Sequence, residues 1–183
     1  DSGDGGDAVA AALTEPSRLT VDQGGSLFVA QLDRVRRVDP SGLISTVLGD
    51  GQPGRDGDSG PAFLARTSGN AGMAIDGEGN LFIAERSAHR IRRIDTQGYV
   101  TTVAGTGVPG SDGDGGPPLE ATLNQPVDVE IDDQGNVLIA ELAGNRIRRI
   151  SGKDGLIGTI IGRGGRAGRG GDGGAAVDAE LNG

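Results

Sequence analysis

The sequence predicts an all-β protein built from short antiparallel strands, and three observations support that class. Glycine accounts for 36 of the 183 residues and proline for only 8, a balance that excludes a collagen-like or proline-rich chain. Apolar residues make up 34% of the chain and are gathered in short runs. Three of these runs are nearly identical, namely SLFVAQ at 26–31, NLFIAE at 80–85 and NVLIAE at 136–141. Short apolar runs separated by glycine-bearing turns favour many short strands.

Two further strand candidates follow each run in the same order. The first is arginine-rich, with RVRRVD at 34–39, RIRRID at 90–95 and RIRRIS at 146–151. The second is ISTVLG at 44–49, VTTVAG at 100–105 and IGTIIG at 157–162. Asp-Gly turns such as 76–80 and 132–136 predict tight antiparallel hairpins between strands. With one more strand before each run, every unit is a four-stranded antiparallel meander, and repeated meanders are the blades of a β-propeller.

The repeat divides the chain into three blades and four inserts. We expect one propeller segment over 1–183, with blades at about 16–49, 70–105 and 126–162. The inserts, at 1–15, 50–69, 106–125 and 163–183, are rich in glycine and aspartate and end in a short helical turn. Because the insert recurs at both ends of the sequence, we expect that Asp1 and Gly183 are not native ends.

The third-strand motif resembles that of the NHL-repeat family. The family's Asn-His-Leu-like triplet matches Ala88-His89-Arg90-Ile91 and Gly144-Asn145-Arg146-Ile147, whereas the first blade departs with Asp33-Arg34-Val35. The resemblance covers essentially the whole chain, including the GDGG-type insert of bacterial and teneurin-type members. It implies a propeller, commonly six-bladed, that acts as a protein- or ligand-binding platform. A minority of relatives are enzymes, namely amidating lyases and gluconolactonase-like hydrolases.

Three blades do not close a ring, so two blade faces are left bare. Each bare face forgoes about 10 kcal/mol of apolar burial, which is as large as the stability of a typical domain. The sequence therefore predicts a homodimer that completes a six-bladed ring, or the remainder of a longer chain. In a two-chain ring, the inserts at 3–15 and 171–183 compete for the same place.

The first strand of each blade contains residues that would lie at the contact between two chains in such a ring, and that are candidates for binding. On one face of this strand the residues are small in the second blade, but they are Arg18 and Thr20 in the first blade and Asp128 and Glu130 in the third. If the third blade of one chain meets the first of another, Arg18 faces Asp128 or Glu130. The alternative is that these four side chains line a wet central channel, where they are candidate binding residues.

The Asp-Gly clusters suggest a cation, because carboxylates in glycine turns suit calcium. Asp58, Asp112 and Asp114 are the candidate ligands. The chain lacks the spacing of an EF-hand loop, because such a loop needs a glutamate at position 12, and position 12 counted from Asp112 is Leu123. Recurrence in every blade favours a turn-capping role over a dedicated site. No other cofactor is predicted, and calcium is retained as the alternative.

Each arginine-rich strand contains three arginines, which we call an arginine triplet. We interpret these triplets and His89 as residues that stabilise the fold. The triplets alternate faces along their strands, and Glu85 and Glu141 at the end of the neighbouring strand are natural cross-strand partners. A basic binding surface is the alternative. His89 is expected to stabilise a turn through a hydrogen bond, with a general base or ligand role as the alternative.

Composition excludes several function classes. With 17 basic and 26 acidic residues the net charge is −9, which argues against nucleic acid as a partner. No apolar run approaches the roughly 18–20 residues of a membrane span, so membrane insertion is not expected. The chain has no cysteine and a single histidine, which excludes thiol chemistry and any site that needs several imidazoles.

The sequence therefore predicts a noncatalytic NHL-repeat propeller that binds a protein or a small molecule. One alternative is a metal-dependent hydrolase or lyase of the gluconolactonase-like or amidating-lyase-like class. A second alternative is a structural spacer of a larger surface protein. The resemblance and the acidic, cysteine-free composition favour a bacterial exported or cell-surface location, and nothing in the sequence names the ligand.

Overall fold

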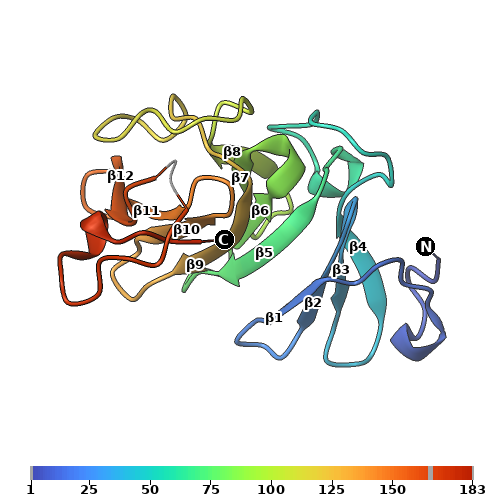
Figure 1. Ribbon diagram of the computed structural model, residues 1–183. Helices are drawn as coiled ribbons and strands as arrows, with labels where there is room; N and C mark the ends of the chain where they lie inside the picture. The colour runs from blue at the N-terminus through green and yellow to red at the C-terminus, as the bar shows by residue number, and fades with distance from the viewer. Residues whose placement is uncertain (1, 165–166, 183) are drawn as a thin grey trace.

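The computed structural model describes residues 2–164 and 167–182, which form three four-stranded antiparallel sheets (Figure 1). The all-β prediction is confirmed, because the described residues contain no α-helix. Each sheet lies within one predicted blade range. The strands are β1 (Arg18–Val21), β2 (Leu27–Gln31), β3 (Arg34–Val38), β4 (Ile44–Leu48), β5 (Asn70–Ile75), β6 (Leu81–Glu85), β7 (Arg90–Ile94), β8 (Val100–Ala104), β9 (Pro126–Ile131), β10 (Val137–Glu141), β11 (Arg146–Ile150) and β12 (Ile157–Ile161).

Each sheet is a meander because its turns are built from aspartate and glycine. In blade 2, the Asp76 carboxylate accepts hydrogen bonds from the Glu78 and Asn80 amides at 3.0 and 2.8 Å. Asp132 holds the β9–β10 turn in the same way, through the Asn136 amide at 2.9 Å. Gly79 follows with a φ of 89°, a backbone conformation that glycine adopts without steric cost. The predicted hairpins are therefore confirmed.

The first strand of every sheet lies innermost. β5 contacts both β1 and β9, so the three sheets follow one another as blades around a common axis (Figure 1). The approach between β5 and β9 requires a glycine at position 72. A Cβ atom at Gly72 would clash with both the side chain and the Cα atom of Asp128.

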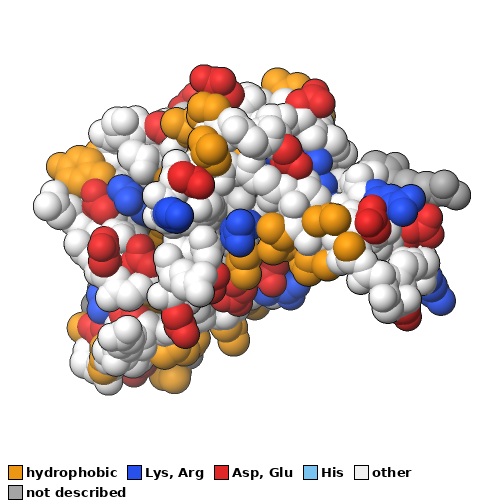
Figure 2. Space-filling view, turned by 90° about the vertical axis from the view of Figure 1, so that its left-hand side faces the viewer, with side chains coloured by type: hydrophobic (Ala, Val, Ile, Leu, Met, Phe, Trp, Pro, Cys, Tyr) orange, Lys and Arg blue, Asp and Glu red, His pale blue; other side chains and the backbone are white. Residues whose placement is uncertain are grey.

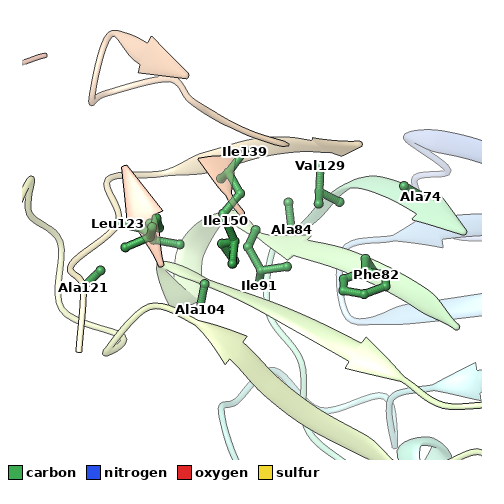
Figure 3. Packing of buried hydrophobic residues seen from close by; sticks show 11 residues of the cluster. Ala74, Phe82, Ala84, Ile91, Ala104, Ala121, Leu123, Val129, Ile139 and Ile150 are labelled. Atoms are coloured by element: carbon green, nitrogen blue, oxygen red, sulfur yellow. The ribbon is translucent and has the colours of Figure 1, made fainter. Parts of the chain in front are cut away.

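Two apolar clusters hold the blades together, one at each seam. Between blades 2 and 3, Phe82 and Ile91 from one sheet pack with Val129 and Ile139 from the next (Figure 3). Between blades 1 and 2, the equivalent side chains include Val35 and Ile83. Blade 2 therefore uses both of its faces, one toward the preceding blade and one toward the following blade.

The two outer blade faces are less covered than their equivalents inside the arc. On β1, Leu19 is 65% exposed, whereas Met73 at the same place in β5 is 7% exposed. On blade 3, Ala140 and Ile147 are half-buried, although Ala84 and Ile91 at the same places in blade 2 are fully buried. Figure 2 shows the side of the molecule beside blade 3, where hydrophobic side chains lie exposed among acidic and basic ones.

The Gly/Asp-rich inserts lie against the outer edges of the sheets, and we call them caps. The second cap begins directly after β4, where the Gly49 amide donates to Ala62 O at 3.1 Å. Further on, its Ser59 amide donates to Val100 O of β8 at 2.8 Å. A cap therefore links one blade to the outer strand of the next. The described 3₁₀ turns are η1 (Ala8–Ala10), η2 (Ala62–Leu64), η3 (Arg86–Ala88) and η4 (Ala176–Asp178), and none is long enough to cross a bilayer.

The Ile139→Ala variant tests the seam between blades 2 and 3. Ile139 is fully buried there, so its truncation is expected to lower the free energy of unfolding by about 2–5 kcal/mol. The measurement is denaturant unfolding followed by circular dichroism. Val9→Ala is the control, because Val9 is 92% exposed and its truncation should change stability by less than about 0.5 kcal/mol. Equal effects of the two variants would contradict the assigned packing.

Candidate functional site

The middle arginine of each third strand is buried, which the alternation of the triplets did not predict. Arg36, Arg92 and Arg148 are 1%, 0% and 0% exposed. A buried guanidinium is tolerated only where its charge and its N–H groups are matched. The partners come from the cap that precedes each blade in the sequence. These arginines therefore join the caps to the blades.

Arg92 shows the full arrangement. Its Nε and Nη2 donate to Asp58 Oδ1 at 2.9 and 2.6 Å. Nη2 also donates to the Asp56 carbonyl at 3.0 Å, and Nη1 donates to the Arg66 carbonyl at 2.9 Å. Glu85 Oε1 lies 3.4 Å from Nη1 on the other side. The cap thus supplies one carboxylate and two carbonyls to a single guanidinium.

Blade 3 repeats the Nη1 and Nη2 contacts of this geometry with other residues, whereas the Arg148 Nε has no hydrogen-bond partner among the described residues. Arg148 Nη2 donates to Asp114 Oδ1 at 2.5 Å and to the Asp112 carbonyl at 3.3 Å, and Nη1 donates to the Thr122 carbonyl at 3.0 Å. The Asp114 carboxylate also accepts from the Thr159 amide at 3.0 Å. The three candidate metal ligands Asp58, Asp112 and Asp114 therefore all contribute an oxygen to an arginine.

Hydrogen bonds set the pKa of the cap aspartates. Burial alone would raise the pKa of Asp58, but hydrogen bonds from Thr102 and Arg92 outweigh burial and hold it below its usual value. Asp114 has a lowered pKa for the same reasons, with Thr159 and Arg148 as partners. Among the described residues, no three His, Cys, Asp or Glu side chains come together as a metal cluster. Calcium at these loops stays a prediction.

The expected cross-strand partners of the arginine triplets are confirmed. Glu85 lies opposite Arg90 in the β6–β7 ladder and forms an ion pair with it, and Glu141 lies opposite Arg146 with an Nε–Oε2 distance of 3.0 Å. Both carboxylates are buried. Burial raises the pKa of Glu141 even though Arg146 and Arg148 oppose that shift.

A hollow of about 460 Å³ opens where the three innermost strands begin. We call it the axial hollow. Segments of all three blades line it, and its polar side chains are basic or neutral, with no carboxylate in the lining. These polar side chains are Ser17, Arg18, Asn70, Arg86, Ser87, His89 and Gln125. The axial hollow is therefore cationic in a chain whose net charge is −9.

Hydrogen bonds between blades position the polar side chains of the axial hollow. Asn70 Nδ2 donates to the Gln31 and Arg34 carbonyls at 3.1 and 3.3 Å, so blade 2 is tied to blade 1. Arg86 Nη2 donates to Gln125 Oε1 at 3.1 Å, which ties blade 2 to the segment before β9. Arg86 remains exposed to solvent. Its guanidinium is therefore oriented by Gln125 and accessible to a ligand.

His89 was expected to stabilise its own turn through a hydrogen bond, but its side chain instead bonds to the segment before β9. Its Nδ1 accepts from the Gln125 amide at 3.2 Å. The backbone of His89 is left-handed, with a φ of 54°, and Asn145 at the equivalent place has a φ of 49°. Burial lowers the pKa of His89, and the nearby Arg55 lowers it further, so the imidazole is neutral at pH 7.

The opposite end of the innermost strands is acidic. A second hollow of about 690 Å³ lies there between the strand turns. Its lining includes one arginine, Arg93, and five carboxylates, from Asp22, Asp76, Glu78, Asp132 and Asp133. Of these, Asp22, Asp76 and Asp132 accept the backbone hydrogen bonds that form the turns. The two ends of the hub therefore differ in sign, and the basic end holds fewer groups committed to turn structure.

The four candidate residues on the first strands do not form one site within the chain. Arg18 lines the axial hollow, and Thr20 is half-buried on the same face of β1. Asp128 and Glu130 are exposed on β9, beside Leu138 and Ile147 on the uncovered face of blade 3. Their binding role stays a prediction.

Two features of the site escaped the sequence argument. The pairing of cap aspartates with buried arginines was missed, although its signal was present as a near-constant separation of 32, 34 and 34 residues in the three blades. Arg86 and Gln125 were missed because nothing in their local sequence shows that they meet across 39 residues.

Three meander sheets that pack face to face around their first strands define a β-propeller arc. Two comparisons then identify its family. A family model described as the Teneurin NHL domain matches residues 1–54. Teneurin-4 from Homo sapiens is 32% identical over 164 residues, which cover 82% of this chain and 6% of teneurin-4. The chain belongs to the NHL-repeat family, and it spans only a small part of the curated relatives that it matches.

Solved propellers share the fold at lower identity. An auxiliary nutrient binding protein from Bacteroides thetaiotaomicron superposes with a TM-score of 0.60 at 22% identity, over 77% of this chain and 36% of that one. A virginiamycin B lyase from Staphylococcus aureus superposes with a TM-score of 0.55 at 21% identity, over 80% of this chain and 41% of that one. At these identities the likeness establishes the fold alone.

The Asp58→Asn variant tests the arginine–cap link. Loss of the carboxylate leaves the buried Arg92 guanidinium undermatched, so we expect a loss of about 1–3 kcal/mol of unfolding free energy at pH 7. Because the fold lowers the pKa of Asp58, its contribution is present above the usual value of 3.8 and is lost as the pH falls through the folded pKa. The difference between wild type and variant, measured by thermal unfolding, should therefore shrink in acid.

Asp133→Asn is the matched control, because Asp133 is exposed in a turn and the substitution removes the same charge. It should leave the melting temperature nearly unchanged. If Asp133→Asn and Asp58→Asn have the same effect, net charge and not the Arg92 contact determines the result.

Proposed function

We propose that this chain is part of a noncatalytic binding propeller whose axial hollow takes the anionic group of a small molecule. The observation that carries the proposal is the cationic lining of the axial hollow in an acidic chain. Arg18 and Arg86 supply guanidinium groups, which bind carboxylates and phosphates through paired N–H donors. Ser17 and Ser87 add neutral polar groups, whereas the buried Asn70 amide is already committed to backbone carbonyls of blade 1.

The size and position of the axial hollow support a small ligand. Its volume of about 460 Å³ lies within the range of roughly 300–1,000 Å³ that small-molecule sites occupy. It is bounded by three blades, so a ligand there contacts segments that are far apart in the sequence. The neutral His89 is already a hydrogen-bond acceptor for Gln125, which favours a positioning role over a general base.

The alternatives have less support from the described residues. A metal-dependent hydrolase or lyase is compatible with the fold, since the lyase from Staphylococcus aureus shares it. In this chain, the Asp58 and Asp114 carboxylates are engaged by arginines, and Asp112 contributes its backbone carbonyl to Arg148 while it remains exposed in the third cap. Asp128 and Glu130 are exposed on blade 3. The structural spacer stays a further alternative, and it predicts no ligand at the axial hollow.

Arg86→Gln tests the proposal directly. Using inorganic phosphate and succinate as probes, we expect saturable binding to the wild type by isothermal titration calorimetry or by NMR shifts. The variant should bind about tenfold more weakly, which corresponds to the loss of one charge-assisted hydrogen bond. Binding of both probes should also weaken as salt is raised.

Lys153→Gln is the control, because Lys153 is exposed in the β11–β12 turn and the substitution removes the same charge outside the axial hollow. It should leave the affinity unchanged. Equal losses in the two variants would show nonspecific attraction, and the absence of saturable binding to the wild type would overturn the proposal.

A further inference from the structure

A third hollow, of about 530 Å³, lies between blades 1 and 2, and we call it the seam hollow. It is separate from the axial hollow, with which it shares no lining residue. Both of its walls belong to blade faces that meet within the chain, and the second cap closes one side. Its large apolar side chains come from all three parts, namely Phe28, Val47, Phe63, Leu81 and Ile94.

Two aromatic rings are accessible in the seam hollow, although the chain has only four aromatic residues. Phe28 on β2 is half-buried, and Phe63 in the second cap is 54% exposed. Phe82, which occupies the place of Phe28 in blade 2, is 7% exposed and belongs to the apolar cluster of the next seam. The seam hollow therefore offers ring surface to a ligand that the equivalent packing one blade later covers.

One aspartate and one arginine of the seam hollow balance each other. Arg37 Nη2 donates to Ser26 Oγ at 2.8 Å, which fixes the guanidinium beside the β1–β2 turn. Hydrogen bonds from Ser26 hold the pKa of Asp22 below its usual value, and the nearby positive charge of Arg37 adds to that effect. Asp22 is therefore ionised at pH 7, and its charge is compensated by Arg37.

Asp95 supplies a second carboxylate, which no cation compensates. Its Oδ1 accepts hydrogen bonds from the Gln97 and Tyr99 amides, both at 2.9 Å, and so forms the β7–β8 turn. Within the described part of the chain, no basic side chain forms an ion pair with Asp95. Asp95 is half-buried at the lining of the seam hollow. The seam hollow thus combines apolar walls with one unmatched negative charge.

These features are departures from the repeat and not part of it. At the seam between blades 2 and 3, Leu119 stands at the place of Phe63, and Ser151 stands at the place of Asp95. That seam is packed without the second ring and without the carboxylate. The fold therefore does not require either group, which favours a ligand as the reason for their presence together at one seam.

We propose that the seam hollow binds a small organic ammonium ion with an aromatic or branched aliphatic body. The ammonium group pairs with the Asp95 carboxylate, and the apolar body packs against Phe28 and Phe63, whose ring faces also attract a cation. The volume of about 530 Å³ lies within the range of roughly 300–1,000 Å³ that small-molecule sites occupy. Because the axial hollow is cationic, the two hollows select ligands of opposite charge.

Phenethylamine is the probe that tests the proposal, with affinity measured by isothermal titration calorimetry and location by NMR shifts of backbone amides. We expect saturable binding, with the largest shifts at Val47, Phe63, Thr96 and Gly98. Phenethyl alcohol has the same ring but no charge and should bind about tenfold more weakly. Methylamine has the charge but little apolar surface and should show no saturable binding.

Phe63→Ala tests the apolar wall, and Leu119→Ala is its matched control. The two side chains occupy equivalent places in successive caps and are 54% and 55% exposed, so both variants should keep the wild-type melting temperature. Phe63→Ala should weaken phenethylamine binding by about tenfold, because one of the two rings is lost. Leu119→Ala should leave the affinity unchanged.

Asp95→Asn tests the charge, and Asp39→Asn is its matched control. Asparagine keeps the side-chain oxygen that accepts the turn hydrogen bonds, so the turn should persist. Asp39 forms the equivalent turn of blade 1 through the Ser41 and Leu43 amides at 2.9 and 3.0 Å, and it lies outside the seam hollow. Asp95→Asn should weaken phenethylamine binding by about tenfold, and Asp39→Asn should not weaken it.

Three results would overturn the proposal. The first is no saturable binding of phenethylamine to the wild type, and the second is equal affinity for phenethylamine and methylamine. The third is a set of amide shifts centred on Asp76 and Asp132, which would place the probe in the acidic hollow at the hub. Inorganic phosphate, the probe for the axial hollow, should not displace phenethylamine, so this proposal and the proposed function can fail independently.

Discussion

An arginine guanidinium buried in the third strand of each blade joins a glycine-rich cap to the sheet, and the order of the caps depends on this contact. Arg92 and Arg148 are removed from water, so each requires acceptors in nearly every direction of its planar fork. The caps provide those acceptors and at the same time pair with the outer strand of the blade. A glycine-rich segment with few apolar side chains is thereby ordered against the sheet by polar contacts.

The apolar faces of the blades impose the second constraint. The sheet of blade 2 is hydrophobic on both sides, and each side is buried against a neighbouring blade. Blade 2 has both, and its Ile83 and Ile91 are fully buried on opposite faces. Blades 1 and 3 have one each, which explains why equivalent positions such as Leu19 and Met73 differ so strongly in exposure.

Much of the architecture was predictable because it is local. The order of strands, the hairpin turns at Asp76 and Asp132, and the ion pairs of Glu85 and Glu141 with the facing arginines follow from period-two alternation and turn chemistry. The axial hollow was predictable only in part. Arg18 was recognised from its unusual first-strand position, whereas Arg86 and Gln125 belong to different blades and are brought together by the curvature of the arc. Burial of Arg36 was also missed, because strand alternation gives the side of the sheet and not what covers it.

The sequence by itself determined the all-β class, the number and order of the blades, the NHL-type repeat and the absence of thiol chemistry. Those properties depend on residue types at fixed short spacings, which determine backbone conformation directly. The tertiary structure decided which carboxylates meet the buried arginines, which end of the hub is basic, and which faces lack a neighbour. These properties depend on contacts between residues about 30 to 40 positions apart, such as Asp58 with Arg92, and such contacts exist only once the sheets have packed around a common axis.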